Sequence, residues 1–173
     1  MAVTRLLSVD DAEELASLVC ENRDFLAPWQ PLHSEAYFTA DGQRASLQQA
    51  LDAYRREAMV PLGIVAEDGR LAGRISLNSI IRGAAQSAAV GYWVSQADNG
   101  RGLASAAVAD AVDIAFGQLG LHRLQAETVL LNTPSQRVLI RNRFQPFAIA
   151  PCYLKIAGRW QDQILFQRLN PSE

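Results

Sequence analysis

Cysteine and long apolar runs are both scarce in this 173-residue chain. Its two cysteines, Cys20 and Cys152, are too few and too far apart in sequence for a disulfide framework or a zinc motif. No apolar run approaches the ~20 residues that a membrane-spanning helix needs. The first residues also lack the basic head and apolar core of a secretory signal. We therefore expect a cytoplasmic protein with no metal site and no membrane partner.

An excess of either charge is missing as well. The 16 basic and 18 acidic residues leave a net charge of −2, and the sequence pI is about 5.7. This balance gives no electrostatic reason to expect nucleic acid as a partner. Apolar residues make up 49% and charged residues 20% of the chain, as in a folded globular protein. The length suits one domain of ordinary size, so we expect residues 1–173 to form a single domain.

Apolar periodicity and turn residues predict strands and helices along the whole chain. Strands are expected at Thr4–Val9, Leu62–Ala66, Leu71–Ile81, Ala88–Val94, Arg123–Val129, Phe144–Ala150 and Gln163–Leu169. Helices are expected from a cap at Ser8 or Asp10 to Asn22, and over Asp41–Ala58, Gly102–Leu119 and Pro134–Arg141, with a proline-broken loop at Phe25–His33. This order predicts an α/β (α+β) fold, in which a mixed sheet carries helices on both faces.

Two glycines stand between the strand that ends at Val94 and the helix that follows it. Gly100 and Gly102 remove side chains where the backbone must turn tightly and approach a ligand. The first amides of the helix have no partner within it, and the helix dipole places partial positive charge there. The combination is typical of a phosphate-binding site, although an ordinary strand-to-helix turn can have the same spacing. Neither the P-loop nor the three-glycine dinucleotide motif matches the segment.

The glycine segment resembles the pyrophosphate loop of the GCN5-related N-acetyltransferases, the GNAT family, whose motif is Arg/Gln-x-x-Gly-x-Gly/Ala. Asn99 stands where Arg or Gln is usual. Further blocks follow in the order of the family, at Gly120–Ala126, Asn132–Leu139 and Tyr153–Asp162. Together they are similar to the branch that contains the ribosomal-protein N-terminal alanine and serine acetyltransferases. The resemblance implies a central sheet in which two neighbouring strands splay apart and acetyl-CoA lies in the opening.

The resemblance also implies which residues bind acetyl-CoA. Backbone groups of the strand Tyr92, Trp93 and Val94 are expected to contact the pantetheine arm, and the amides of the loop are expected to bind the pyrophosphate. Arg101 could supply the charge that Asn99 lacks, or be a solvated loop residue. The loop comprises Asn99, Gly100, Arg101, Gly102, Leu103 and Ala104.

Asn132 and Ser135 form a second group of candidate residues. In the family, the Asn contacts the pantetheine, and the Ser is proposed to hydrogen-bond the departing thiolate, where negative charge develops. Many relatives instead use Tyr seven residues after the Asn, where this chain has Leu139. The other interpretation is that Asn132 and Ser135 cap the helix that has Pro134 near its start, and both interpretations can hold.

A general base is not evident in the sequence. Related enzymes often carry Glu two residues before the Gly of the Gly-Tyr-Trp strand, and Ala89 stands there. Glu127 is the nearest acidic candidate, unless it is only a solvated strand residue.

Trp29 resembles the substrate-side loop residue of the family, or it is a core residue that fills the space under its own loop. His33 is interpreted as an exposed loop residue and His122 as a structural residue.

The end of the Asn132 helix departs from the family, which usually has Gly before Phe in a conformation with positive φ. Arg143 precedes Phe144 here, and Asn142 tolerates that conformation better than Arg does. We therefore expect the helix to end one residue early, with Asn142 in the left-handed region.

These residues and the resemblance predict an acetyl-CoA-dependent N-acetyltransferase that transfers acetyl directly to a primary amine. The expected acceptor is a protein N-terminal α-amine, because its pKa of ~8 leaves far more free amine at neutral pH than the ~10.4 of lysine. That acceptor suits a site without a local Glu base. One alternative is a small-molecule amine such as an antibiotic. Another is a non-catalytic acetyl-CoA-binding module, for which Ala89, Asn99 and Arg143 are the evidence. An edge strand or the C-terminal hairpin could support a homodimer.

Overall fold

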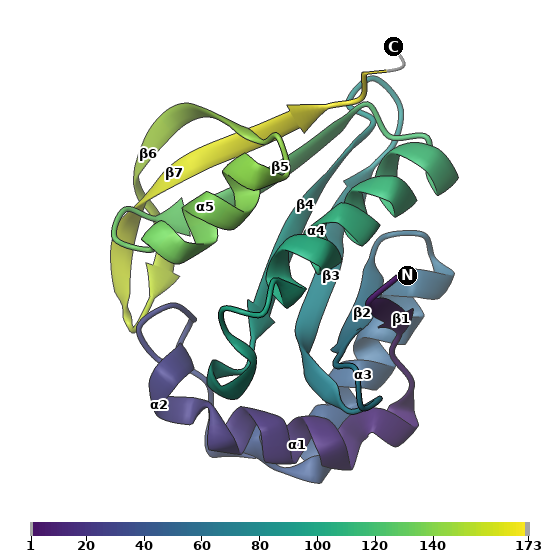
Figure 1. The fold of residues 1–173 in the computed structure, drawn as a ribbon, viewed down its shortest axis with the longest axis vertical. Helices are drawn as coiled ribbons and strands as arrows, with labels where there is room; N and C mark the ends of the chain where they lie inside the picture. Colours follow the sequence, from purple (N-terminus) through teal and green to yellow (C-terminus); the bar gives the residue numbers. More distant parts are fainter. Residues whose placement is uncertain (1, 172–173) are drawn as a thin grey trace.

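The computed structural model describes residues 2–171, and a seven-stranded sheet lies at its centre (Figure 1). The strand order is β1-β2-β3-β4-β5-β7-β6, with β4 and β5 parallel and the other neighbours antiparallel. The strands are β1 Thr4–Leu6, β2 Val60–Val65, β3 Leu71–Ile81, β4 Ser87–Val94, β5 Arg123–Val129, β6 Gln145–Ile156 and β7 Arg159–Leu169. The α-helices are α1 Ala12–Glu21, α2 Arg23–Leu26, α3 Ala40–Arg55, α4 Leu103–Asp113 and α5 Thr133–Arg141. The predicted mixed sheet is confirmed.

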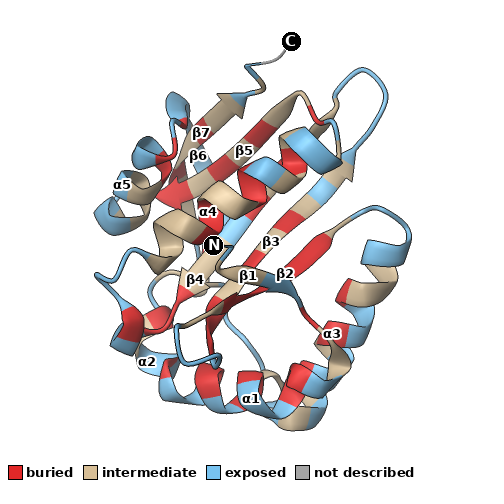
Figure 2. Cartoon of the chain, turned by 45° about the vertical axis from the view of Figure 1, so that its right-hand side comes forward, coloured by how far each residue is buried: buried red, intermediate tan, exposed pale blue. Residues whose placement is uncertain are grey.

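Side-chain alternation along the strands gives the sheet two apolar faces. On one face, Ile75 and Val90 join the main core together with Val108 of α4. On the other face, Leu15 of α1 and Leu47 of α3 form a second cluster, against which Trp93 packs. Figure 2 shows buried residues along the central strands and exposed residues on the outer turns of α1 and α3. Within residues 2–171, no helix combines the length and apolar content that crossing a bilayer requires.

The strands β4 and β5 separate along their length, as the resemblance implied. Their pairing consists of three rungs, the last of which joins Ala89 to Gln125. Beyond that rung β4 stays paired with β3, and β5 stays paired with β7. Figure 1 shows the two strands diverging beneath α4 and α5. An opening in the sheet therefore lies between the C-terminal ends of β4 and β5.

Several predicted element boundaries were wrong. The first strand ends at Leu6, because Ser8 caps a 3-10 turn at Val9–Asp11 instead of starting the α-helix directly. Arg23–Leu26 forms the short helix α2, which includes the first two residues of the loop predicted at Phe25–His33. β6 and β7 are longer than expected and meet in a tight turn at residues 157–158. Phe144 is buried in the main core and precedes β6.

α5 ends at Arg141 as predicted, but the expectation that Asn142 takes the left-handed conformation was wrong. Asn142 has a φ of −88°, and Arg143 takes the left-handed conformation with a φ of 62°. The Asn142 side chain donates to the backbone oxygens of Ser105, at 3.1 Å, and Val138, at 3.0 Å. Asn142 is the C-cap of α5, and these bonds hold it against α4, while the exposed Arg143 takes the left-handed conformation.

Candidate active site

The loop before α4 presents backbone amides rather than side chains. Gly100 and Gly102 have φ values of 78° and 83°, and Gly102 is the N-cap of α4 with no side-chain cap. A Cβ added at either glycine would meet no atom within 4 Å. The first amides of α4 therefore face open space at the positive end of the helix dipole. This arrangement fits a pyrophosphate group.

A cavity of about 430 Å³ begins at this loop and continues into the opening of the sheet. It brings together residues from the segments that the sequence analysis selected. The predicted residues that line it are Trp29, Trp93, Val94, Asn99, Gly100, Gly102, Leu103, Ala104, Asn132 and Ser135. Tyr92, whose strand was expected to contact the pantetheine, also lines it, and other lining residues were missed from the sequence, among them Phe25, Asp98 and Arg141.

Arg101 and Glu127 are not among the residues that line this cavity. Arg101 is 67% exposed, and its Nη1 lies 3.5 Å from Asp98 Oδ1. Glu127 lies on β5 opposite Leu165 and is half-buried, and burial raises its pKa. Arg101 is therefore a solvated loop residue in this structure, which is one of the two interpretations considered for it, and Glu127 lies away from this cavity.

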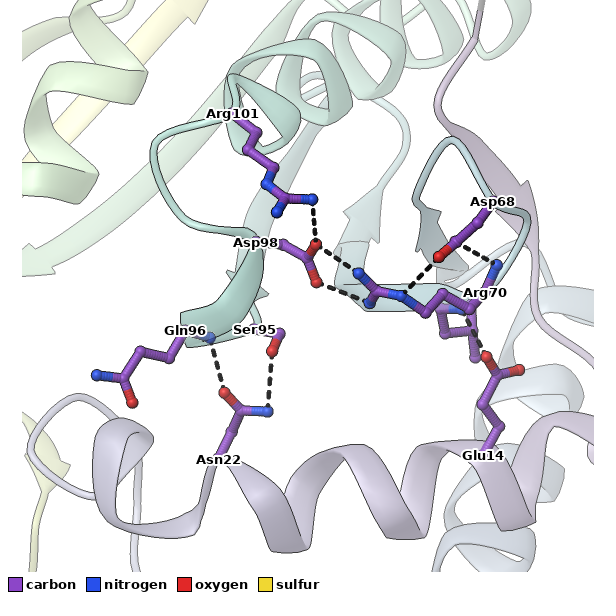
Figure 3. A network of polar contacts seen from close by, with 9 residues as sticks. Glu14, Asn22, Asp68, Arg70, Ser95, Gln96, Asp98 and Arg101 are labelled. Atoms are coloured by element: carbon purple, nitrogen blue, oxygen red, sulfur yellow. Dashed lines mark hydrogen bonds and ion pairs between the residues drawn. The ribbon is translucent and has the colours of Figure 1, made fainter.

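The segment before the glycine loop is held by an ion pair (Figure 3). Asp98 is buried, and both of its carboxylate oxygens accept from Arg70, at 2.8 and 2.7 Å. These hydrogen bonds hold the pKa of Asp98 below its usual range. Arg70 in turn donates to Asp68 at 3.0 Å, within the turn between β2 and β3. The pair therefore ties the start of the loop to that turn.

A buried asparagine holds the same segment from the other side (Figure 3). Asn22 follows α1, and its side-chain oxygen accepts from the Gln96 amide at 2.7 Å. Its nitrogen donates to Ser95 Oγ at 3.2 Å and to the Leu18 backbone oxygen at 2.8 Å. Two distant parts of the chain thus fix the backbone that leads into the loop.

The start of α5 forms a second wall of the cavity. Asn132 is its N-cap, and the Asn132 oxygen accepts from the Ser135 amide at 3.3 Å, with Pro134 in the first turn. The capping interpretation is therefore confirmed, and both residues line the cavity as well. The Ser135 hydroxyl lies 2.9 Å from Tyr92 Oη, which also donates to the Ser135 backbone oxygen at 3.1 Å. Burial raises the pKa of Tyr92 to about 12.

A second cavity, of about 580 Å³, lies on the other side of Trp29. Trp29 is half-buried and lines both cavities. The other residues of the second cavity come from the α2 end, the β5–α5 connection and the β6–β7 hairpin: Pro28, Val129, Leu130, Leu131, Ala157, Arg159, Trp160, Gln161 and Asp162. Asp162 is the acidic member of this set, and its Oδ1 accepts from the Cys152 amide at 2.9 Å. The sequence analysis did not select Asp162.

The remaining candidates lie elsewhere. Ala89 occupies the last rung before the opening and offers no titratable group. His33 is exposed and stacks on Tyr37 with ring centroids 3.7 Å apart, while burial against its neighbours lowers its pKa. Cys20 and Cys152 are both free and exposed. Among residues 2–171, no group of His, Cys, Asp and Glu side chains is arranged to hold a metal ion.

The splayed mixed sheet, with an amide-lined loop at the start of α4, defines the acetyltransferase fold that the sequence blocks resemble. The model of the acetyltransferase (GNAT) domain matches residues 3–145. The chain therefore belongs to the GNAT family and is an N-acetyltransferase.

Two curated relatives and two solved structures illustrate the match. A Bacillus subtilis protein named as a probable N-acetyltransferase, YjcK, is 39% identical over 98% of this chain and 94% of its own. The uS5-alanine N-acetyltransferase of Escherichia coli is 29% identical over 98% and 88%. The ribosomal-protein-S5-alanine acetyltransferase of Vibrio fischeri superposes with a TM-score of 0.92 at 31% identity, covering 97% and 92%. Mycobacterium smegmatis RimJ, solved with CoA-disulfide, gives 0.93 at 27% identity, covering 98% and 82%.

Proposed function

We propose that this enzyme transfers acetyl from acetyl-CoA directly to a protein N-terminal α-amine of the ribosomal-protein type. The observation that carries the proposal is the position of Trp29 between two cavities. The first contains the amide-lined loop that fits a pyrophosphate, so it is the donor site. The second opens between the β5–α5 connection and the β6–β7 hairpin, so it is the acceptor site.

In the donor site, each group of residues contacts a particular part of acetyl-CoA. The amides from Asn99 to Ala104 hold the pyrophosphate, and backbone groups of Trp93 and Val94 contact the pantetheine. Asn132 contacts the pantetheine while capping α5. Acetyl-CoA supplies an activated acetyl thioester when it is bound. The Ser135 hydroxyl then donates toward the sulfur, where negative charge develops as the thiol leaves.

The walls of the acceptor site favour a peptide over a small amine. Leu131 is 84% exposed and Trp160 is 63% exposed, so two large apolar side chains at this cavity meet solvent. An extended peptide would cover them, whereas a small amine would leave most of this area open. The Asp162 carboxylate attracts an ammonium group. Deprotonation of the acceptor falls to solvent, because Ala89 provides no base.

Thiol release from acetyl-CoA tests this function. Hexapeptides that begin with Ala or Ser are compared with the same peptides N-acetylated, with N-acetylated peptides that carry an internal Lys, and with a panel of small primary amines. We expect release with the free N-terminal peptides alone. Release with small amines alone would overturn the acceptor class. Binding of acetyl-CoA without release by any acceptor would show a non-catalytic module.

Three further expectations concern the domain organisation, location and assembly of the enzyme. We propose that residues 1–173 act as one domain and that the enzyme works in the cytoplasm, where ribosomal proteins are made. A homodimer through the edge strand β6 is also proposed. Phe147 and Ile149 on this strand are 44% and 64% exposed, and light scattering across a concentration series measures the oligomeric state.

A further inference from the structure

A hydrogen bond joins the two walls of the donor cavity. Tyr92 lies on β4 and Ser135 lies in the first turn of α5, 43 positions later, and both line the cavity. The Tyr92 oxygen is 2.9 Å from the Ser135 hydroxyl and 3.1 Å from the Ser135 backbone oxygen. The phenol therefore reaches across the opening of the sheet to one residue of α5, and to both of that residue's oxygens.

Two hydroxyl hydrogens can satisfy this geometry in two ways. In one arrangement, Tyr92 donates to the Ser135 backbone oxygen and the Ser135 hydroxyl donates back to Tyr92, so both hydrogens are engaged. In the other, Tyr92 donates to Ser135 Oγ, and the hydrogen of Ser135 is free to point into the cavity. The change needs only rotation about two C–O bonds, because every heavy atom keeps its place.

We propose that Tyr92 is a positioning residue that holds the Ser135 hydroxyl in the second arrangement and so aims its hydrogen at the leaving sulfur. This inference rests on the proposed function. In the transfer, the amine nitrogen bonds to the acetyl carbon, the carbon–sulfur bond breaks, and the sulfur keeps the electron pair. One proton leaves the nitrogen for solvent, and solvent returns one to the sulfur. The Ser135 hydrogen bond stabilises the thiolate in between, and the bond from Tyr92 strengthens it.

The surroundings of Tyr92 suit this task. Its backbone pairs with Ile75 of β3, so the ring is mounted on a paired strand. Burial raises its pKa to about 12, so the phenol remains a donor throughout the physiological range. Leu139, the α5 residue at which many relatives carry tyrosine, is fully buried in the core and has no hydrogen to donate. The phenol of Tyr92 on β4, in contrast, lies within hydrogen-bond distance of Ser135.

A double-mutant cycle tests whether Tyr92 acts through Ser135. The variants are Tyr92→Phe, Ser135→Ala and the pair, assayed by thiol release with Ala- and Ser-initiated hexapeptides. Tyr92→Phe should lower kcat about tenfold, the factor expected for one lost hydrogen bond, while calorimetric acetyl-CoA affinity stays within about twofold. In the Ser135→Ala background the same change should have no further effect. Tyr54→Phe, at a 40% exposed tyrosine of α3, is the matched control and should leave kcat unchanged.

A Tyr92→Phe enzyme with normal kcat would overturn the proposal. A double variant whose kcat is reduced by the product of the two single-variant reductions would overturn it as well.

A second measurement needs no turnover. The thiol of coenzyme A bound to the protein is titrated by its ultraviolet thiolate absorbance. At a pH well below the pKa of the bound thiol, the thiolate fraction should fall about threefold to tenfold in Tyr92→Phe and in Ser135→Ala. If no peptide is acetylated, the proposed function fails, but the titration still tests whether Tyr92 stabilises the bound thiolate through Ser135. An unchanged titration overturns the role of Tyr92 alone.

Discussion

Asn22 connects the end of α1 to the backbone before the glycine loop, and its removal should weaken both the fold and acetyl-CoA binding. The side chain is 2% exposed and makes three hydrogen bonds, to Gln96, Ser95 and Leu18. Asn22→Ala leaves the Gln96 amide and the Ser95 hydroxyl without this partner. An unsatisfied buried group costs about 1–3 kcal/mol. Since the Gln96 bond is only partly buried, we expect a total loss of about 2 kcal/mol.

For a chain of this length, that loss lowers Tm by roughly 4–8 °C, as differential scanning calorimetry would measure. The loop would then be held from one side only, by the Arg70–Asp98 pair. We therefore expect the Kd of acetyl-CoA in titration calorimetry to rise about threefold to tenfold. Gln48→Ala removes an exposed amide that donates to Asp52 on α3, and it is the matched control with little change in either value. A lower Tm with an unchanged Kd would refute the link between Asn22 and the loop.

Three other changes test separate parts of the structure. Gly102→Val should abolish acetyl-CoA binding in calorimetry, because the side chain fills the space before the α4 amides and resists a φ of 83°; unchanged affinity would remove the loop from the donor site. Arg143→Gly should raise the free energy of unfolding by about 0.5–1 kcal/mol in urea denaturation, because glycine relieves the left-handed strain at Arg143. The log of kcat/KM should rise with pH up to the pKa of the acceptor amine, near ~8, and the inflection should follow the amine when two peptides of different N-terminal pKa are compared. An inflection that stays fixed below neutrality would instead indicate an enzyme base such as Glu127, whose pKa burial raises.

The parts of the fold that could be predicted are those with strong local patterns. The predicted strands at Leu71–Ile81 and Arg123–Val129 match β3 and β5 residue for residue, because alternation and flanking turn residues mark their ends. β7 begins earlier than predicted because β6 and β7 meet in a two-residue turn at Ala157 and Gly158, whose φ values are 49° and 79°, and the prediction did not use the signal that Gly158 gives. After α5, a hydrogen bond from the Asn142 side chain to Ser105 of α4 holds Asn142 outside the left-handed region, although local propensity favours that conformation there.

In the candidate site, too, the features with local sequence signals could be predicted and those that depend on long-range contacts could not. The glycines that mark the loop, and the Asn132–Ser135 spacing that marks the start of α5, are local signals, and the structure brings both segments to one cavity. Tyr92 could be placed on the α4 face of its strand by alternation, yet its contact with Ser135 depends on how far β4 and β5 diverge. The pairing of Arg70 with Asp98 spans 28 positions and joins two turns, so no window of sequence reveals it.

The three-rung junction between β4 and β5 divides the sheet into two panels that share little backbone pairing. One panel is β1–β4 with the loop at the start of α4, and the other is β5–β7–β6 with α5. The cavity is lined by residues of both panels, so a bound donor molecule would contact both and stabilise their relative position. A ligand present at a hundredfold excess over its Kd adds about 2.7 kcal/mol to the stability of the folded state. The fraction of this enzyme that stays folded would then rise and fall with the concentration of its own donor.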